Sequence, residues 1–187
     1  MKCMIALVWF STFVVFLGYS SIAPFFPPQL ASRGMNPLLN SVVFAAYSIT
    51  YVIFSIVLSN VFIPKYGRST SFFIAAVMEL VAIGLLATLP YIPNNGLFLT
   101  VAIVARLLQG GGSSIMVSLS YTLVSLAYPD KLEILHTLLQ QAITLGLAIS
   151  PFAGSFFYKL IGYLGPFLFV GVMSIPPLFV PCTLINV

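Results

Sequence analysis

The sequence predicts an all-α membrane protein, a polytopic bundle of six transmembrane helices that forms a single domain over residues 1–187. Two observations lead to this prediction. Hydrophobic residues make up 60% of the chain and charged residues only 5%, whereas about 25% of a soluble domain is charged. The apolar residues also form continuous runs of about 20 residues, which is the length that crosses a bilayer as a helix.

The same features exclude other classes of protein. A transmembrane β-barrel has strands of about ten residues with alternating polarity, so these longer continuous runs do not fit one. The net charge is +4, but the basic residues are scattered, which argues against a nucleic-acid partner. Cys3 and Cys182 lie at opposite ends of the chain and have no metal-ligand spacing, so we expect neither a metal nor a cofactor.

The boundaries of the six helices follow from the breaks between the apolar runs. Each break contains proline, glycine or charged residues typical of turns. For the first run, a cleaved signal peptide is an alternative, although the run extends to Ala23 and is long for such a peptide. The predicted helices cover about residues 4–24, 41–63, 70–90, 97–127, 133–158 and 166–186.

The orientation follows from the basic residues in the loops. With the amino terminus inside the cell, the outer loops hold only Arg33 and Lys159, and the inner loops hold four basic residues. Loops rich in Lys and Arg stay on the cytoplasmic side, so we expect both termini in the cytosol. The sequence does not distinguish a vesicle from the plasma membrane. The four inner residues are Lys2, Lys65, Arg68 and Lys131.

Two ionisable residues fall at the middle of predicted spans. Arg106 and Glu79 each lie nine residues into their span, about 13 Å deep at the rise of an α-helix. Charges at this depth are costly, and their presence indicates a function by default. We therefore consider both as proton-coupling candidates that pair with each other. In the alternative interpretation, which we favour for Glu79, each only satisfies the other or a backbone carbonyl.

The residues after Arg106 form a motif of small side chains. Gln109 follows after three positions, and then come three glycines, Gly110 to Gly112, and two serines. Small residues let another helix approach closely. This pattern resembles the fourth-helix motif of the major facilitator superfamily, Arg-x-x-Gln-Gly followed by small residues. The resemblance implies that the chain is the amino-terminal six-helix half of such a carrier, and that Arg106 takes part in proton coupling.

The fifth predicted span carries a second motif. Gly146, Ser150 and Gly154 recur every four residues, and Pro151 removes a backbone hydrogen bond. The segment is similar to the antiporter motif of the same superfamily, with Ser150 and Ser155 in place of two glycines. The resemblance implies antiport. The alternative is a kinked helix that serves packing alone.

The loop between the second and third spans resembles a third motif of the superfamily. Lys65, Gly67 and Arg68 match that motif. Asn60 replaces its first glycine, and Pro64 replaces the acid that normally makes its charge contacts. In the alternative interpretation, the two basic residues only anchor the inner surface to anionic lipid.

A narrower resemblance, to the polyamine-type branch of the vesicular amine transporter family, extends over nearly the whole chain. It rests on segments 24–27 and 162–167, the Tyr66-Gly67 turn, Arg106 and the fifth-span motif. The resemblance implies an amine substrate. Against this, the first span has no acid, and Gln140 stands where that branch carries one. Aromatic faces can bind a cation, although packing is the plainer explanation for these aromatic residues.

The sequence therefore predicts membrane transport of a small solute, by proton-coupled antiport, with organic cations or amines as the candidate substrate class. A site between two halves needs a second six-helix half, from the same polypeptide or another chain. A non-transporting membrane scaffold or half-transporter subunit is the alternative. We do not expect an enzyme, because the one histidine, His136, has only Asp130 and Glu133 nearby, and these are typical of a solvated loop.

Overall fold

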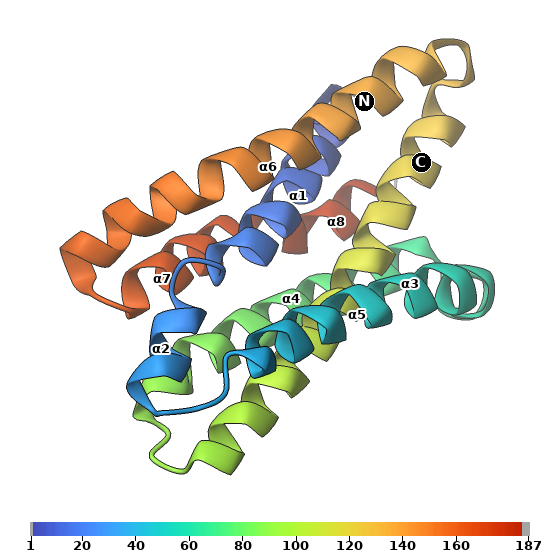
Figure 1. Cartoon of the computed structure of the whole chain (residues 1–187). Coiled ribbons are helices and arrows are strands. Elements are labelled where there is room, and N and C mark those ends of the chain that lie inside the picture. Colours follow the sequence, from blue (N-terminus) through green and yellow to red (C-terminus); the bar gives the residue numbers. More distant parts are fainter. Residues whose placement is uncertain (1, 185–187) are drawn as a thin grey trace.

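A computed structural model describes residues 2–184 of the chain, with side chains for residues 4–56, 61 and 63–182. Helices are the only regular structure in this part of the chain (Figure 1). Six of them are long and apolar enough to cross a membrane, which confirms the predicted fold class. The six candidate spans are Met4–Ser32, Leu38–Ile56, Arg68–Tyr91, Asn95–Ala127, Pro129–Ile161 and Leu164–Cys182.

The spans are built from eight α-helices and three short 3₁₀ helices within residues 2–184. The α-helices are α1 (Lys2–Ser21), α2 (Phe26–Ser32), α3 (Leu38–Tyr66), α4 (Arg68–Thr88), α5 (Asn95–Ala127), α6 (Leu132–Ile161), α7 (Leu164–Met173) and α8 (Val180–Leu184). The 3₁₀ helices are η1 (Leu89–Tyr91), η2 (Pro129–Lys131) and η3 (Pro176–Phe179).

The region after the first span differs from the prediction. The sequence predicts one turn from Pro24 to Pro37, but this region contains the short helix α2. Pro27 and Pro28 lie in the first turn of α2, where the missing N–H groups would have no helical partner in any case. The prolines therefore begin a second helix instead of only ending the first.

The sixth span is interrupted, where the sequence predicts one helix over 166–186. α7 ends at Met173, and η3 begins at Pro176 before the chain continues as α8. Pro176 and Pro177 cannot donate the backbone hydrogen bonds that would continue α7. Residues 185 and 186 of this prediction lie outside the described residues.

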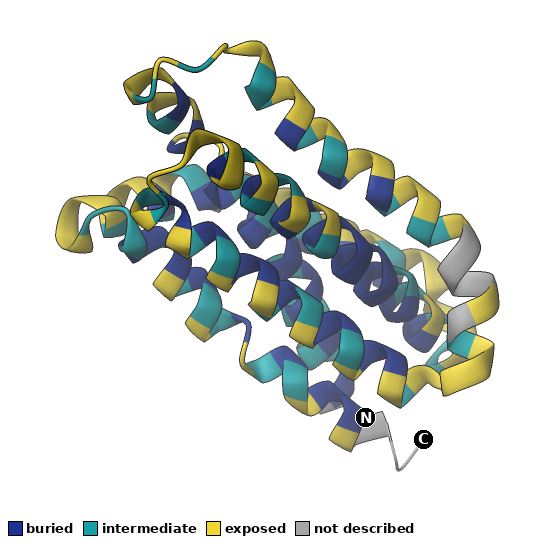
Figure 2. Ribbon diagram, turned by 90° about the horizontal axis from the view of Figure 1, so that it is seen from below, coloured by how far each residue is buried: buried dark blue, intermediate teal, exposed yellow. Residues whose placement is uncertain are grey.

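The helices form two groups that pack side by side. α5 packs along both α3 and α4, and α1 packs along α6 with α7 beside them; α4 joins the groups through α7 and α8. Buried residues face the interior, and exposed residues follow the outer faces of the helices (Figure 2). Many of these exposed side chains are large and apolar, such as Ile49 and Ile53 on α3 and Phe152 and Phe156 on α6. This outer surface suits contact with lipid.

Two apolar clusters fill the interior, one toward each end of the bundle. The first includes Phe72 of α4 and Leu119 of α5, and the second includes Leu86 of α4 and Phe98 of α5. Along α4 and α5 the two clusters are separated by residues 77–82 and 106–114. Five buried polar side chains from these segments form a polar layer between the clusters: Glu79, Arg106, Gln109, Ser113 and Ser114.

The three glycines of α5 allow the close packing around this layer. A side chain at Gly110 would collide with the backbone carbonyl of Tyr47 on α3. A β-carbon at Gly112 would lie 2.8 Å from the carbonyl oxygen of Ala75 on α4. α5 therefore fits between α3 and α4 because neighbouring glycines face each of them.

We predict that Gly112→Ala lowers the free energy of unfolding by about 1–3 kcal/mol, because the added methyl group meets backbone that cannot move aside cheaply. The matched control is Gly84→Ala on α4, where nothing lies within 4 Å of the added methyl group. The control gains helix propensity and should be neutral or stabilising. Unfolding in mixed detergent micelles measures both values, and an equal effect of the two substitutions would contradict the prediction.

Candidate functional site

The guanidinium group of Arg106 is completely buried in the polar layer. Its Nη1 and Nη2 atoms donate to the carbonyl oxygen of Tyr19 at 3.2 and 3.1 Å, and Nη1 also donates to Oε1 of Gln109 at 2.6 Å. The group lies 4.8 Å from the ring centre of Phe44, with the rings of Tyr19 and Tyr47 at 5.5 and 5.8 Å. Arg106 is thus held by acceptors and aromatic faces from three spans.

The carbonyl of Tyr19 is available because α1 ends two residues later. In a continuing helix it would accept from the N–H of Ala23, but that N–H donates to Ser20 at 3.2 Å. The last carbonyls of a helix have no helical partner, and they form its negative end. The buried cation of Arg106 therefore occupies the carboxyl-terminal end of α1.

Glu79 faces the interior of the bundle, and its side chain is only 4% exposed. The hydroxyl group of Ser113, on α5, donates to its Oε1 atom. The amide nitrogen of Gln109, also buried on α5, makes no hydrogen bond within 3.5 Å. The sequence did not predict which way the side chain of Glu79 faces. In the structure it faces α5.

Arg106 and Glu79 share the layer but do not form an ion pair. Within the described residues, Arg106 donates hydrogen bonds to the backbone carbonyl of Tyr19 and to the side chain of Gln109. The carboxyl group of Glu79 accepts its hydrogen bond from Ser113. The direct pairing expected from their equal depth is therefore wrong. Gln109 accepts from Arg106 through its carbonyl oxygen, and its buried amide nitrogen has no hydrogen-bond partner.

Several polar atoms in the layer are buried without a hydrogen-bond partner. They include Nε of Arg106, Nε2 of Gln109 and the hydroxyl oxygen of Tyr47. Buried polar groups in native structures are nearly always paired, so each exception needs an explanation. The atoms around the two ionisable groups therefore have hydrogen-bonding capacity that the described residues do not use.

The fifth-span motif is a contact surface for α1. A β-carbon at Gly146 would lie 2.5 Å from the carbonyl oxygen of Phe13, and one at Gly154 would lie 3.2 Å from the ring of Phe25. Between them, the buried hydroxyl group of Ser150 donates to the carbonyl oxygen of Leu17 at 2.7 Å. α6 continues through Pro151, which lies inside the helix.

Comparison with known proteins identifies the fold family. The model of the Major Facilitator Superfamily matches residues 8–184. The chain belongs to the major facilitator superfamily. This finding confirms the superfamily resemblance drawn from the fourth- and fifth-span motifs.

Curated relatives match most of the chain at low identity. The "MFS-type transporter SLC18B1" of Mus musculus is 23% identical over 166 residues, which are 89% of this chain and 36% of that protein. The protein of the same name from Homo sapiens is 22% identical over 156 residues, which are 82% of this chain and 33% of that protein. The chain thus spans about a third of the length of these relatives.

The motif between the second and third spans is a tight helix connection. Gly67 alone separates α3 from α4, and its φ of 79° is a conformation that glycine adopts readily. Lys65 and Arg68 are exposed on either side, and Lys65 Nζ lies 5.3 Å from the ring centre of Tyr66. The side chain of Asn60 lies outside the described residues.

The sequence drew attention to Gln140 and His136 on α6 but missed their partners on α5, Tyr121 and Ser125. The hydroxyl group of Tyr121 donates to Oε1 of Gln140 at 3.5 Å, and Ser125 Oγ lies 3.0 Å from Nε2 of His136. Within the described residues, no three His, Cys, Asp or Glu side chains are grouped closely enough to hold a metal ion. The sequence included Ser113 only among the small residues after Arg106 and did not predict its bond to Glu79, although its position seven residues after Arg106 places it on the same helix face.

We predict that Ser150→Ala lowers the free energy of unfolding by about 1 kcal/mol, the typical net value of one hydrogen bond. The control is Ser155→Ala, because Ser155 is exposed and donates only within α6, to Pro151 at 2.8 Å. Unfolding in mixed micelles compares the two variants. If they prove equally stable, the bond from α6 to α1 does not contribute to stability.

Proposed function

We propose that this chain forms the amino-terminal half of a proton-coupled antiporter, which exchanges a small organic cation for protons across a membrane. Arg106 and Glu79 are the proton-coupling residues in this proposal. A second six-helix half supplies the opposite wall of the solute site, as in carriers built from two such halves. The length of the curated relatives, about three times the matched segment, supports the need for that second half.

The observation that carries the proposal is the polar layer. A guanidinium and a carboxyl group are buried at one depth without neutralising each other directly. Burying two such groups is costly, and a helix bundle that served only as a scaffold would have no need of them. A carboxyl group near a fixed cation can gain and lose a proton as its surroundings change, which is what proton coupling requires.

Aromatic rings support an organic cation as the solute. The rings of Tyr19 and Tyr47 lie 4.3 Å apart, and Tyr51 continues the row at 6.0 Å from Tyr47. The row leads from the buried layer to the half-buried Tyr51. Aromatic faces attract an organic ammonium group without requiring a full charge from the protein. The similarity to the vesicular amine transporter family favours the same class.

We predict that Arg106→Gln abolishes gradient-driven uptake, and that Glu79→Gln uncouples uptake from the proton gradient. Gln keeps the size and polarity of each side chain but removes its charge. Arg106→Lys is the matched control for charge, and it should retain only part of the activity because Lys lacks the planar fork that binds Tyr19 and Gln109.

The measurement is uptake of a radiolabelled polyamine into proteoliposomes with an imposed pH gradient, by this chain together with its second half. Thermal unfolding of each variant shows whether it remains folded. Normal uptake by a folded Arg106→Gln variant would exclude the proposed role of Arg106, and would favour a non-transporting membrane subunit.

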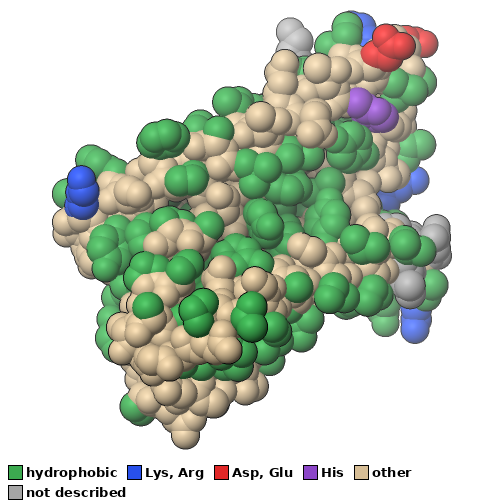
Figure 3. Space-filling model, viewed as in Figure 1, with side chains coloured by type: hydrophobic (Ala, Val, Ile, Leu, Met, Phe, Trp, Pro, Cys, Tyr) green, Lys and Arg blue, Asp and Glu red, His purple; other side chains and the backbone are tan. Residues whose placement is uncertain are grey.

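We also propose that both termini face the cytosol. On the face in Figure 3, the visible acidic side chains and most of the visible basic ones gather at one end of the molecule, and the middle shows almost no charge, which supports this orientation. An impermeant thiol reagent added outside intact cells should label Lys159→Cys but not Lys131→Cys, with Cys3 and Cys182 replaced by Ser. The opposite labelling pattern would reverse the orientation.

A further inference from the structure

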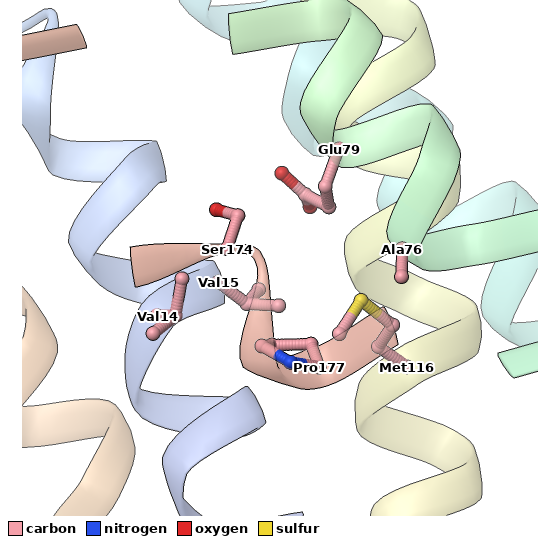
Figure 4. Close-up of a pocket in the computed structure, with 7 residues that line it drawn as sticks. All are labelled: Val14, Val15, Ala76, Glu79, Met116, Ser174 and Pro177. Atoms are coloured by element: carbon pink, nitrogen blue, oxygen red, sulfur yellow. The ribbon is translucent and has the colours of Figure 1, made fainter. Parts of the chain in front are cut away.

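A small cavity lies beside the carboxyl group of Glu79. Val14 and Val15 of α1, Ala76 of α4 and Met116 of α5 form its apolar walls. The remaining lining comes from the turn after α7, at Ser174 and Pro177. Figure 4 shows Glu79 and Ser174 beside this space, on separate segments of the chain. We call it the Glu79 cavity.

The Glu79 cavity has the size of one water molecule. The space open to the centre of a water-sized sphere is about 10 Å³, close to the smallest volume that holds a water. Such a water also needs two to four polar partners. A metal cation is a poor fit, because Ca²⁺ takes six or more oxygen ligands and Mg²⁺ six, and only two oxygen-bearing side chains line the cavity.

Both polar side chains of the lining have capacity left for a water. Glu79 is 4% exposed and receives one hydrogen bond, at Oε1 from Ser113, whereas a carboxylate accepts several. The hydroxyl group of Ser174 is also 4% exposed and donates to Val170 at 2.8 Å, so its oxygen can still accept. A water between the two side chains could donate to both.

The interruption of span six leaves one backbone carbonyl next to Ser174 without a helical partner. Pro177 has no N–H to donate to the carbonyl of Met173, and the N–H of Leu178 donates to Ile175 at 3.0 Å. The carbonyl of Met173, directly before Ser174, is therefore not used by the next turns of the helix. A buried water commonly binds carbonyls that proline frees in a membrane helix.

From these observations we infer that the Glu79 cavity is a binding site for one water molecule, bonded to Glu79 and Ser174, through which Glu79 exchanges its proton. In the exchange, the O–H bond of protonated Glu79 breaks and a new O–H bond forms on the water. The water passes one of its own protons to solvent water. The inference rests on the proposed role of Glu79 as the proton carrier, and it adds the partner with which the carboxyl group exchanges.

Infrared spectroscopy of the whole chain in lipid nanodiscs tests this inference. The carbonyl stretch of Glu79, measured at a pH low enough to protonate it, is assigned by its loss in Glu79→Gln. Transfer to D₂O shifts the band at the rate of proton exchange. We expect Ser174→Ala to slow this exchange roughly three- to tenfold, the effect of one hydrogen bond, and Ala76→Val, which fills the cavity, to slow it at least as much.

Two control substitutions on α4 make the same chemical changes, Ser to Ala and Ala to Val, away from the cavity. Ser71→Ala removes a buried hydroxyl group that does not line the cavity, and Ala82→Val adds the same two methyl groups at another buried position. Both should exchange at the wild-type rate. Wild-type exchange in folded Ser174→Ala and Ala76→Val would overturn the inference, and so would equal slowing in the controls. If Ala76→Val does not fold, Ser174→Ala alone decides the outcome.

Uptake assays separate this inference from the proposed function. Normal gradient-driven uptake in Glu79→Gln would overturn the role of Glu79 in transport, whereas slowed exchange in Ser174→Ala would still establish the water site. Coupled uptake that is lost in Glu79→Gln, together with unchanged exchange in Ser174→Ala, would support the transport role and overturn the water site.

Discussion

A guanidinium group in the middle of a bilayer must have acceptors, and this bundle is organised around supplying them to Arg106. The surrounding lipid supplies no water at that depth, so each unsatisfied group costs several kcal/mol. The bundle supplies the carboxyl-terminal end of α1 and one amide side chain, at Tyr19 and Gln109. α1 ends at Ser21, which leaves the carbonyl of Tyr19 free to accept from Arg106. In a longer helix, this carbonyl would accept a backbone hydrogen bond instead.

Close packing of small residues holds these partners in place. The glycines of α5 bring its backbone against α3 and α4, and Gly146 and Ser150 bring α6 against α1. In lipid, helices gain little from the hydrophobic effect, so van der Waals contact and hydrogen bonds between helices supply the association energy. The two helix groups thus meet at the polar layer, where α1 is bound from one side by Ser150 and from the other by Arg106.

Both interruptions of the membrane spans lie near this polar layer. The first frees the carbonyl of Tyr19 for Arg106, and the second, at Pro176 and Pro177, forms one wall of the cavity beside Glu79. Irregular backbone is tolerated within a membrane only where protein or an internal cavity covers it. Both breaks thus lie where protein side chains of the polar layer and the Glu79 cavity cover the irregular backbone.

The sequence by itself determined the membrane class, the six spans and the superfamily, because these depend on the length of apolar runs and on local motifs. It also indicated Arg106, since a charge in an apolar run is conspicuous. It could not determine that Glu79 bonds to Ser113 while Arg106 bonds to Tyr19, nor that α2 and the break in span six exist. Depth along a helix is a local quantity, but the direction in which a side chain faces depends on how the helices pack, and only the tertiary structure decides that.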